Sequence, residues 1–320
     1  MSTRRVRAAA LDRRAFLRSV ALLAAGGTLA ACGSRSPAAS VPPSPQAGAT
    51  GDTTDPGADA VARVAPDADM SLAVVAANFE YLVDQANPLV FGLFTIEQEP
   101  IEGATAQVYA IPPDGGDPLG PWDAVPAEVD VPPGGLYLSD PGFSTTGVHQ
   151  VVVATDDGRA GTVALDVRDA SSSQLPAPSE QAPAVPTPTE GSPLGYETLC
   201  TQTPEPCGMH EVSLDEALRG DQPVVVLFAT PAFCQTAVCG PTVEVLEEIR
   251  TEYRDVTFIH CEIFSDAGTT VGDPVAAWEL PTEPWLFTID PAGTIVRRAD
   301  GPLLVVADEV RSLIDDALPA

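Results

Sequence analysis

The sequence contains no lysine: its 16 basic residues are all arginines, against 45 acidic residues. Six of the arginines precede residue 19, so the acidic excess falls on the rest of the chain, and the formal net charge is −29. Nucleic-acid binding needs basic surface to displace counterions, so this composition argues against it. No nucleotide, haem or flavin motif is evident either, and we expect no cofactor. A strongly acidic chain is compatible with a colloidally stable extracytoplasmic protein.

The arginine-rich start is typical of an export signal. Residues 13–17, Arg-Arg-Ala-Phe-Leu, resemble the twin-arginine export motif, and residues 19–29 form an apolar run. That run is shorter than the roughly 20 residues that span a bilayer, so it indicates a signal-peptide core. The sequence Leu-Ala-Ala before Cys32 resembles a bacterial lipobox. We therefore predict a signal peptide over residues 1–31 and a lipidated Cys32 that anchors the exported protein to the cell membrane. An ordinary signal peptide with an incidental cysteine is the alternative.

Two further segments have the composition of connectors. Residues 32–69 are rich in Ser, Pro, Ala, Gly and Asp and have few large apolar residues, which predicts a disordered tether. Residues 169–193 return to Ser, Pro, Gln, Ala and Thr and predict a semi-extended linker. They leave two globular regions, residues 70–168 and 194–320.

The first region has a β pattern. Runs rich in Val, Leu, Phe and Tyr alternate with Pro/Gly-rich turns, and we expect strands at 71–79, 89–95, 106–110, 147–155 and 161–167. The last two flank Asp-Asp-Gly and predict a β-hairpin. Strands at this spacing, without a helical period between them, indicate an all-β immunoglobulin-like sandwich that acts as a spacer or binding module. His149 is a lone histidine within a strand and does not indicate a site.

The second region alternates between strand and helix patterns. A Ser-x-x-Glu capping box predicts a short helix over 213–218. Apolar runs predict strands at 224–229, 256–262 and 285–289, with a hairpin partner at 294–298. Amphipathic patterns predict helices at 242–253, 273–280 and 306–318.

Two cysteines, Cys234 and Cys239, lie between the 224–229 strand and the 242–253 helix. The free N–H groups and positive dipole end of a helix stabilise a thiolate, so this junction favours redox chemistry. Thiol–disulfide exchange is the function that the pattern favours.

The element order of residues 194–320, and the loop 280–290 that leads into a strand, resemble the thioredoxin-like family. The resemblance implies an α/β thioredoxin-like fold and thiol–disulfide oxidoreductase activity. Cys234 would be the attacking or attacked sulfur and Cys239 the resolving thiol. Pro284 matches the family's cis-proline, with Pro281 as the alternative, and would shape the substrate groove. The implied partners are exported proteins with thiols or disulfides, and a redox partner protein.

The sequence departs from the family pattern in two ways. Four residues separate the cysteines where the family has two, and in a regular helix residues five apart lie more than about 7 Å apart at Cα, beyond disulfide geometry. Either Cys239 lies in an irregular loop or the helix unwinds locally. The strand 224–228 is wholly apolar, so no general base for the resolving thiol is visible.

Three other functions stay open. Thr230, Pro231 and the Cys-x4-Cys spacing partly resemble monomeric two-cysteine peroxiredoxins, but the threonine lies one position too early and Pro284 stands where those peroxidases have arginine. Copper-delivery proteins of the same fold combine two cysteines with a distant histidine. In this sequence His260, or Met209 and His210, could be the additional copper ligands. The third is a non-catalytic binding module in which Cys234–Cys239 is a structural disulfide.

The remaining cysteines have structural interpretations. Cys200 and Cys207 are predicted to close a small loop as a structural disulfide in an oxidising compartment. A zinc site that used Cys200, Cys207 and His210 would lack a fourth ligand, so we expect no metal. Cys261 is expected to be a buried, inert thiol.

Overall fold

The computed structural model of the chain describes residues 55–84, 88–129, 131 and 134–319. The predicted signal peptide and Cys32 lie outside these residues, so the export and lipidation predictions are not tested. Residues Thr53–Ala320 form one compact unit. Among the described residues, no helix combines the length and the apolar character that crossing a membrane requires. The unit is rich in β structure, with an eight-stranded sheet, a four-stranded sheet and a few short helices.

The eight-stranded sheet has the strand order β1-β3-β6-β5-β4-β7-β8-β2. Its strands are β1 Leu72–Ala76, β2 Tyr81–Leu82, β3 Leu89–Thr95, β4 Ala106–Ile111, β5 Leu119–Pro126, β6 Leu136–Ser139, β7 Gly147–Thr155 and β8 Ala160–Arg168. The predicted hairpin is confirmed: β7 and β8 pair antiparallel from Gly147↔Val167 to Ala154↔Ala160. Side chains from one face of the sheet meet in a single apolar core that includes Phe91, Val108, Tyr137 and Val151. This arrangement is compatible with an immunoglobulin-like sandwich.

His149 is fully buried in β7 and both ring nitrogens have partners: Nδ1 lies 3.1 Å from the Gly147 carbonyl oxygen and Nε2 3.2 Å from the Thr145 hydroxyl. The residue therefore belongs to the packing of the sheet.

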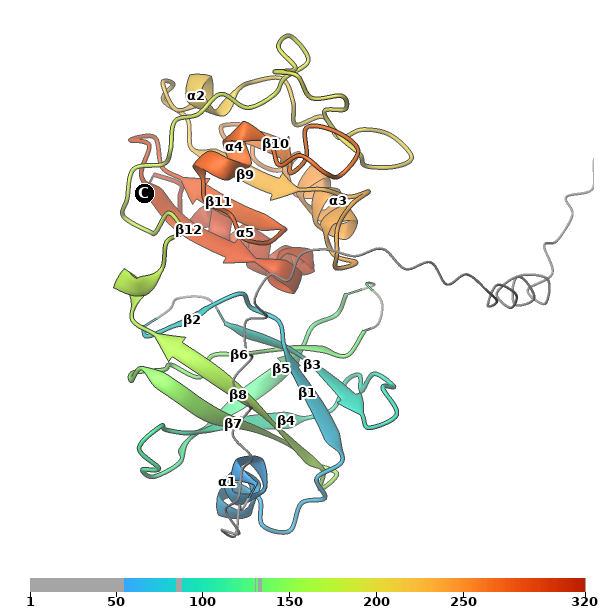
Figure 1. The fold of residues 1–320 in the computed structure, drawn as a ribbon, viewed down its shortest axis with the longest axis vertical. Helices are drawn as coiled ribbons and strands as arrows, with labels where there is room; N and C mark the ends of the chain where they lie inside the picture. Colours follow the sequence, from blue (N-terminus) through green and yellow to red (C-terminus); the bar gives the residue numbers. More distant parts are fainter. Residues whose placement is uncertain (1–54, 85–87, 130, 132–133, 320) are drawn as a thin grey trace, which may run out of the picture. The chain divides into compact units, whose positions relative to one another are not determined.

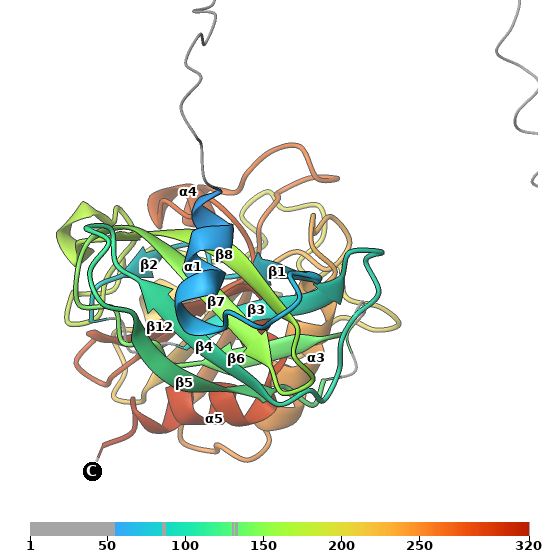
Figure 2. The ribbon, with the colours of Figure 1, turned by 90° about the horizontal axis from the view of Figure 1, so that it is seen from below.

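The prediction of a disordered tether is wrong for the end of the 32–69 segment, where α1 spans Pro56–Val64. Asp55 caps this helix by accepting a hydrogen bond from the Gly57 N–H at 3.0 Å, and a proline in the first turn favours its start. Ala60 and Val61 pack against residues of β7 and β8, over which α1 lies in Figure 2. The segment has few large apolar residues, which is why the sequence did not predict a helix there. A helix this short can still pack against the sheet through a few small apolar side chains, here Ala60 and Val61.

The four-stranded sheet has the order β10-β9-β11-β12, and its strands and helices are labelled in Figure 1. β9 (Val224–Ala229) pairs parallel with β10 (Thr257–Glu262) and antiparallel with β11 (Trp285–Ile289), which pairs antiparallel with β12 (Ile295–Asp300). The helical elements of this part of the chain are α2 Leu214–Ala217, α3 Cys239–Ile249, α4 Asp273–Ala277, the 3₁₀ turn η3 Gly301–Val305 and α5 Ala307–Asp315. A further 3₁₀ turn, η2, spans Ala170–Ser172.

Helical elements cover both faces of this sheet. Because side chains alternate along a strand, Val225 and Leu227 of β9 face α3 and α5, whereas Val226 and Phe228 face the opposite side with α4. A strand that is buried on both faces reads as a continuous apolar run, which is why the sequence located β9 correctly.

The segment predicted as a linker packs against the sheet rather than spanning open space. The Ser179 N–H donates to the Ile295 carbonyl, the Ile295 N–H donates to Glu180, and the Ala182 N–H donates to Gly293, at 2.8–2.9 Å. Leu175 and Ala182 are buried in the same core as Phe287. Residues 179–182 are therefore held against the turn before β12 and the first residue of β12, the edge strand of the sheet.

Candidate functional site

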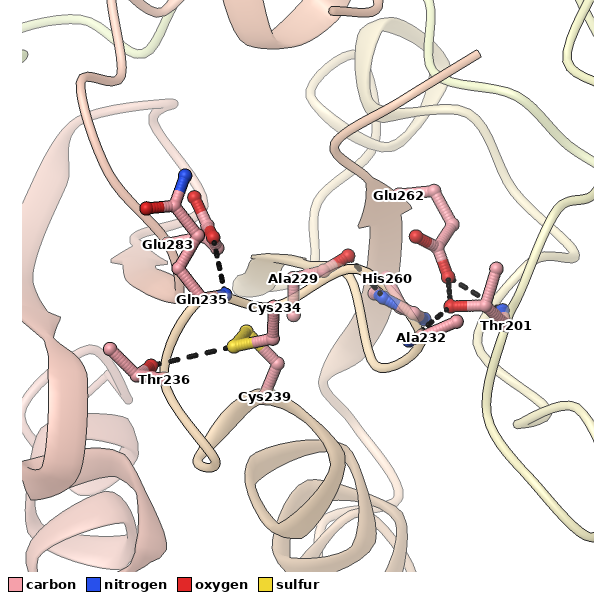
Figure 3. The surroundings of a disulfide bond; sticks show 10 residues. All are labelled: Thr201, Ala229, Ala232, Cys234, Gln235, Thr236, Cys239, His260, Glu262 and Glu283. Carbon is pink, nitrogen blue, oxygen red and sulfur yellow. Dashed lines mark hydrogen bonds between the residues drawn. A yellow bond between two sulfur atoms is a disulfide. The ribbon is translucent and has the colours of Figure 1, made fainter. Parts of the chain in front are cut away.

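The end of β9 and the start of α3 form the candidate site. β9 ends at Ala229, an irregular loop covers 230–238, and α3 begins at Cys239. Cys234 in the loop and Cys239 in the first helical turn are joined by a disulfide bond, with their Cα atoms 6.1 Å apart. Figure 3 shows the two sulfurs above the first turn of α3. The spacing problem raised by the sequence is resolved because Cys234 lies outside the helix, which does not unwind. Cys239 is helical, contrary to the irregular loop that was one of the two options.

The two sulfurs differ in exposure. Cys239 is completely buried and packs in the core with Val243 and Leu246, whereas Cys234 is half-buried at the edge of the same core. Solvent and a second protein can thus approach Cys234 far more easily than Cys239. This asymmetry suits an exchange reaction in which one sulfur is attacked and the other leaves.

Polar groups surround the half-buried sulfur. The Thr236 hydroxyl lies 3.4 Å from the Cys234 Sγ, and the Gln235 N–H donates to the Glu283 carboxylate at 3.4 Å (Figure 3). The hydroxyl can donate a hydrogen bond to a Cys234 thiolate, which would favour the charged form of the thiol. The contact to Glu283 joins the cysteine loop to the loop that contains Pro284.

The Glu283–Pro284 peptide bond is cis, the isomer expected at this position. β11 starts at the next residue, and Trp285 lies opposite Phe228 of β9 in the register of the sheet. The Pro284 carbonyl accepts a hydrogen bond from the Gly301 N–H at 3.1 Å. Strand pairing therefore fixes this loop beside the end of β9; that it shapes a substrate groove stays a prediction.

A buried carboxylate that the sequence analysis missed also reaches the cysteine loop. Glu262, the last residue of β10, is 1% exposed, and its Oε1 accepts from the Thr201 N–H at 2.6 Å and the Thr201 hydroxyl at 2.7 Å. Thr201 Oγ1 in turn accepts from the Ala232 N–H at 3.0 Å, two residues before Cys234 (Figure 3). Glu262 is distant from the cysteines in the sequence, but β10 runs parallel to β9 and ends at the same edge of the sheet, with Glu262 opposite Ala229.

Cys200 and Cys207 do not form the predicted disulfide. Both are free thiols, with their sulfurs 3.7 Å apart. The structure instead brings two histidines to them: His210 Nε2 lies 3.2 Å and His260 Nδ1 3.3 Å from the Cys207 Sγ. The structure therefore gathers four potential metal ligands, Cys200, Cys207, His210 and His260, where the sequence suggested three. The expectation of no metal stays a prediction. The fourth potential ligand, which the sequence analysis did not find, is His260.

The thiols of this region differ in acidity. The hydrogen bond between the Cys200 and Cys207 sulfurs lowers the pKa of Cys200, although burial opposes the change. Burial raises the pKa of Cys261 to about 12, because its side chain lies on the opposite face of β10 from His260, in the apolar core. Cys261 is thus a buried thiol that ionises with difficulty, in line with its expected inert character. Both neighbours, His260 and Cys261, are buried because both faces of the sheet are covered.

The ligands considered for a copper site do not gather at Cys234 and Cys239. His210 and His260 contact the free cysteines, and Met209 is buried in the apolar core. The Thr230 hydroxyl, considered for peroxide binding, is buried without a hydrogen-bond partner among the described residues.

Comparison with known proteins adds little to this geometry. No family model matches the sequence, and no curated protein matches it. Solved structures that match include the crystal structure of the Lin-41 filamin domain, which is 16% identical, covers 31% of this chain and 93% of that chain, and has a TM-score of 0.23. A TM-score this low carries no argument about fold or function.

Proposed function

We propose that the chain carries out thiol–disulfide exchange through Cys234 and Cys239, on a thioredoxin-like fold formed by residues 194–320. The sheet order supports this fold: a parallel β9–β10 pair and an antiparallel β11–β12 pair, with α3 after β9 and α5 at the end. Residues 70–168 would form a separate immunoglobulin-like domain that presents or spaces the redox domain.

The observation that carries the proposal is the unequal exposure of a bonded cysteine pair at a helix start. A thiolate of a partner protein would attack the half-buried Cys234 Sγ, forming a mixed disulfide and releasing the Cys239 thiolate, which takes up a proton. A second thiolate of the partner would then attack the partner's first sulfur, which is bonded to Cys234 in the mixed disulfide. This step forms a disulfide within the partner and releases the Cys234 thiolate. The partner loses two electrons and two protons, and the pair gains them; the reverse direction uses the same bonds.

The surroundings favour Cys234 as the exchanging sulfur. The Thr236 hydroxyl and the N-terminal N–H groups of α3 are donors near the cysteine pair, where a thiolate develops. Glu283 and Pro284, which lie in a loop held next to Gln235, would contact the partner's extended chain. We further propose that the protein is exported and lipid-anchored through Cys32, so that its partners are exported proteins with thiols or disulfides and a second redox protein that renews the pair.

The reduction potential of the pair tests the proposal. The full mature chain would be equilibrated with glutathione buffers, and the redox state of Cys234 and Cys239 read by alkylation and peptide mass spectrometry, with Cys234→Ser as the control. A working exchange site should have a potential above about −300 mV. A pair that stays oxidised below that value would be a structural bond, and the binding-module function would replace the enzymatic one.

A further inference from the structure

The strongest unassigned feature is the four-residue cluster of Cys200, Cys207, His210 and His260. Each residue offers one possible ligand atom, and these four atoms all lie within 4.8 Å of one another. Cys200, His210 and His260 are buried and Cys207 is half-buried. Two of the residues come from an irregular loop, one from the chain just after it, and His260 from β10, so tertiary folding brings them together.

The separations match a metal site better than a disulfide. In a tetrahedral zinc site, Zn–S bonds of about 2.3 Å and Zn–N bonds of about 2.05 Å place two sulfurs about 3.8 Å apart and a sulfur and a nitrogen about 3.5 Å apart. The Cys200 and Cys207 sulfurs are 3.7 Å apart, and the sulfur–nitrogen contacts measure 3.2, 3.3 and 3.7 Å. A disulfide would need sulfurs at about 2.05 Å, well inside the separation observed.

The second nitrogen of His260 has the partner that metal-binding histidines usually have. Its Nε2 lies 3.1 Å from the Ala229 carbonyl oxygen (Figure 3), which makes Nε2 the protonated nitrogen. The Nδ1 lone pair is then free to face the sulfurs of Cys200 and Cys207, which lie 3.7 and 3.3 Å away. A hydrogen bond of this kind fixes the tautomer and the ring orientation of a ligand. The backbone also holds the strand against the loop, because the His260 N–H donates to the Met209 carbonyl at 2.9 Å.

His210 supplies an independent indication. Its side chain is 4% exposed, Nε2 faces the Cys207 sulfur, and Nδ1 has no hydrogen-bond partner among the described residues. Burying an imidazole whose polar contacts are weakly hydrogen-bonding thiols is unfavourable. A cation at the centre of the cluster would give Nε2 a strong interaction and offset this cost.

We propose that Cys200, Cys207, His210 and His260 bind one Zn²⁺ through two Sγ atoms, His210 Nε2 and His260 Nδ1. Two thiolates and two neutral imidazoles form a ligand set that suits Zn²⁺, and four protein ligands make a closed structural site rather than a catalytic one. Binding exchanges the two thiol protons for the metal ion and forms four metal–ligand bonds without any oxidation or reduction. The two thiolate charges neutralise the ion, so the buried site carries no net charge.

The bound ion would fix the loop 200–210 to β10. That loop also contains Thr201, which hydrogen-bonds both Glu262 and the Ala232 N–H of the redox loop. The zinc site would therefore support the wall of the redox site, while its own cysteines take no part in exchange. This inference is separate from the proposed function, because zinc can bind whether or not Cys234 and Cys239 exchange.

Metal analysis of matched cysteine variants tests the proposal. The mature chain and its Cys207→Ser and Cys261→Ser variants would be purified with reductant, loaded with Zn²⁺, dialysed and analysed for metal by mass spectrometry. We expect one zinc ion per chain in the wild type and in Cys261→Ser, and at least about a hundredfold weaker binding in Cys207→Ser. Cys261→Ser is the matched control. It makes the same cysteine-to-serine change next to His260 in β10, but its side chain lies on the other face of the strand, away from the cluster.

Two measurements on the unaltered chain keep the test decisive if Cys207→Ser does not fold. Co²⁺ should replace zinc and give the intense visible bands of tetrahedral cobalt with sulfur-to-metal charge transfer. Zinc should also protect Cys200 and Cys207 from alkylation until a chelator is added. The proposal is overturned if the wild type binds no zinc, if it holds a Cys200–Cys207 disulfide, or if Cys207→Ser keeps its zinc.

Discussion

Asp300 makes the stability of the protein depend on pH in a way that one substitution can remove. The residue ends β12 opposite Trp285, is 8% exposed, and accepts a hydrogen bond from the Phe79 N–H at 2.7 Å. Burial raises the pKa of Asp300 from its ordinary 3.8 to about 7; the nearby Glu80 adds to the rise, and the Phe79 N–H and Arg298 oppose it. The folded protein therefore holds a proton on Asp300 that the unfolded chain releases.

The sign and size of the effect follow from this difference. Because the pKa is raised in the folded state, the stabilisation is complete below about pH 4 and is lost as the pH rises to about 7. One pKa unit corresponds to about 1.4 kcal/mol, so a shift of this size costs up to ~4 kcal/mol at pH 8. Asp300→Asn stays neutral and keeps an oxygen that can accept from Phe79. We expect it to raise the free energy of unfolding by ~2–4 kcal/mol at pH 8 and to change it by less than ~1 kcal/mol at pH 4.

Urea unfolding between pH 4 and pH 8, followed by tryptophan fluorescence, measures this effect. Trp285 is a suitable probe, since it pairs with Asp300 in the sheet and its ring lies 5.9 Å from that of Phe79. The exposed Asp221, changed to Asn, is the matched control and should have little effect at either pH. A variant that destabilises the protein equally at both pH values would refute the reasoning, because it would mean that Asp300 is charged in the folded state.

Three further predictions concern the redox pair and a buried ion pair. In Cys239→Ser, the half-buried Cys234 should form a lasting mixed disulfide with a thiol-containing peptide activated by Ellman's reagent. In Cys234→Ser, the buried Cys239 should not. Equal amounts of mixed disulfide in both variants, measured by mass spectrometry, would contradict the assigned roles. Thr236→Val should lower the reduction potential of the pair by ~20 mV, because it removes a donor to the thiolate worth ~1 kcal/mol at this exposed position, while Thr236→Ser should leave the potential unchanged. Glu80→Gln should destabilise the protein by ~2–3 kcal/mol in urea unfolding at pH 7, because Glu80 and Arg298 form a buried ion pair. An unchanged free energy of unfolding would contradict this. It would mean that the carbonyl oxygens of residues 175 and 176, which also accept hydrogen bonds from Arg298, stabilise its charge without Glu80.

The sequence predicted those elements whose signals are local. The apolar run of β9 and the Asp-Asp-Gly turn between β7 and β8 are short-range patterns, and both elements lie where they were expected. β5 was missed because Gly120, Pro121 and Pro126 suggest a loop, although prolines are tolerated in strands where no ladder N–H is needed. The start of α3 was placed three residues late because Gly240 and Pro241 were read as a helix break. Proline is instead favoured in a first turn, where the N–H groups have no helical partners.

The candidate site was predictable only in part. The Cys234–Cys239 pair and Pro284 stand next to strands with clear patterns, so their positions could be inferred from chain order. The cluster of Cys200, Cys207 and His260 could not, because 53 residues separate Cys207 from His260 and only the pairing of β10 with the loop brings them within 3.3 Å. A Cys-x6-Cys-x2-His spacing alone is compatible with a disulfide, a metal site or neither.

Chain that precedes the four-stranded sheet contacts both of its edge strands, β10 and β12. Residues 179–182 hydrogen-bond to Ile295 at the start of β12 and to Gly293 in the turn before it, and the Met209 carbonyl accepts from the His260 N–H of β10. An uncovered edge strand offers free N–H and C=O groups on which another chain can add, so these two segments protect the protein from edge-to-edge association. A fragment cut at residue 194, the predicted start of the second globular region, would keep the contact with β10 but lose the one with β12. We expect such a fragment to self-associate more readily than one that begins before residue 175 and keeps the Pro-rich segment.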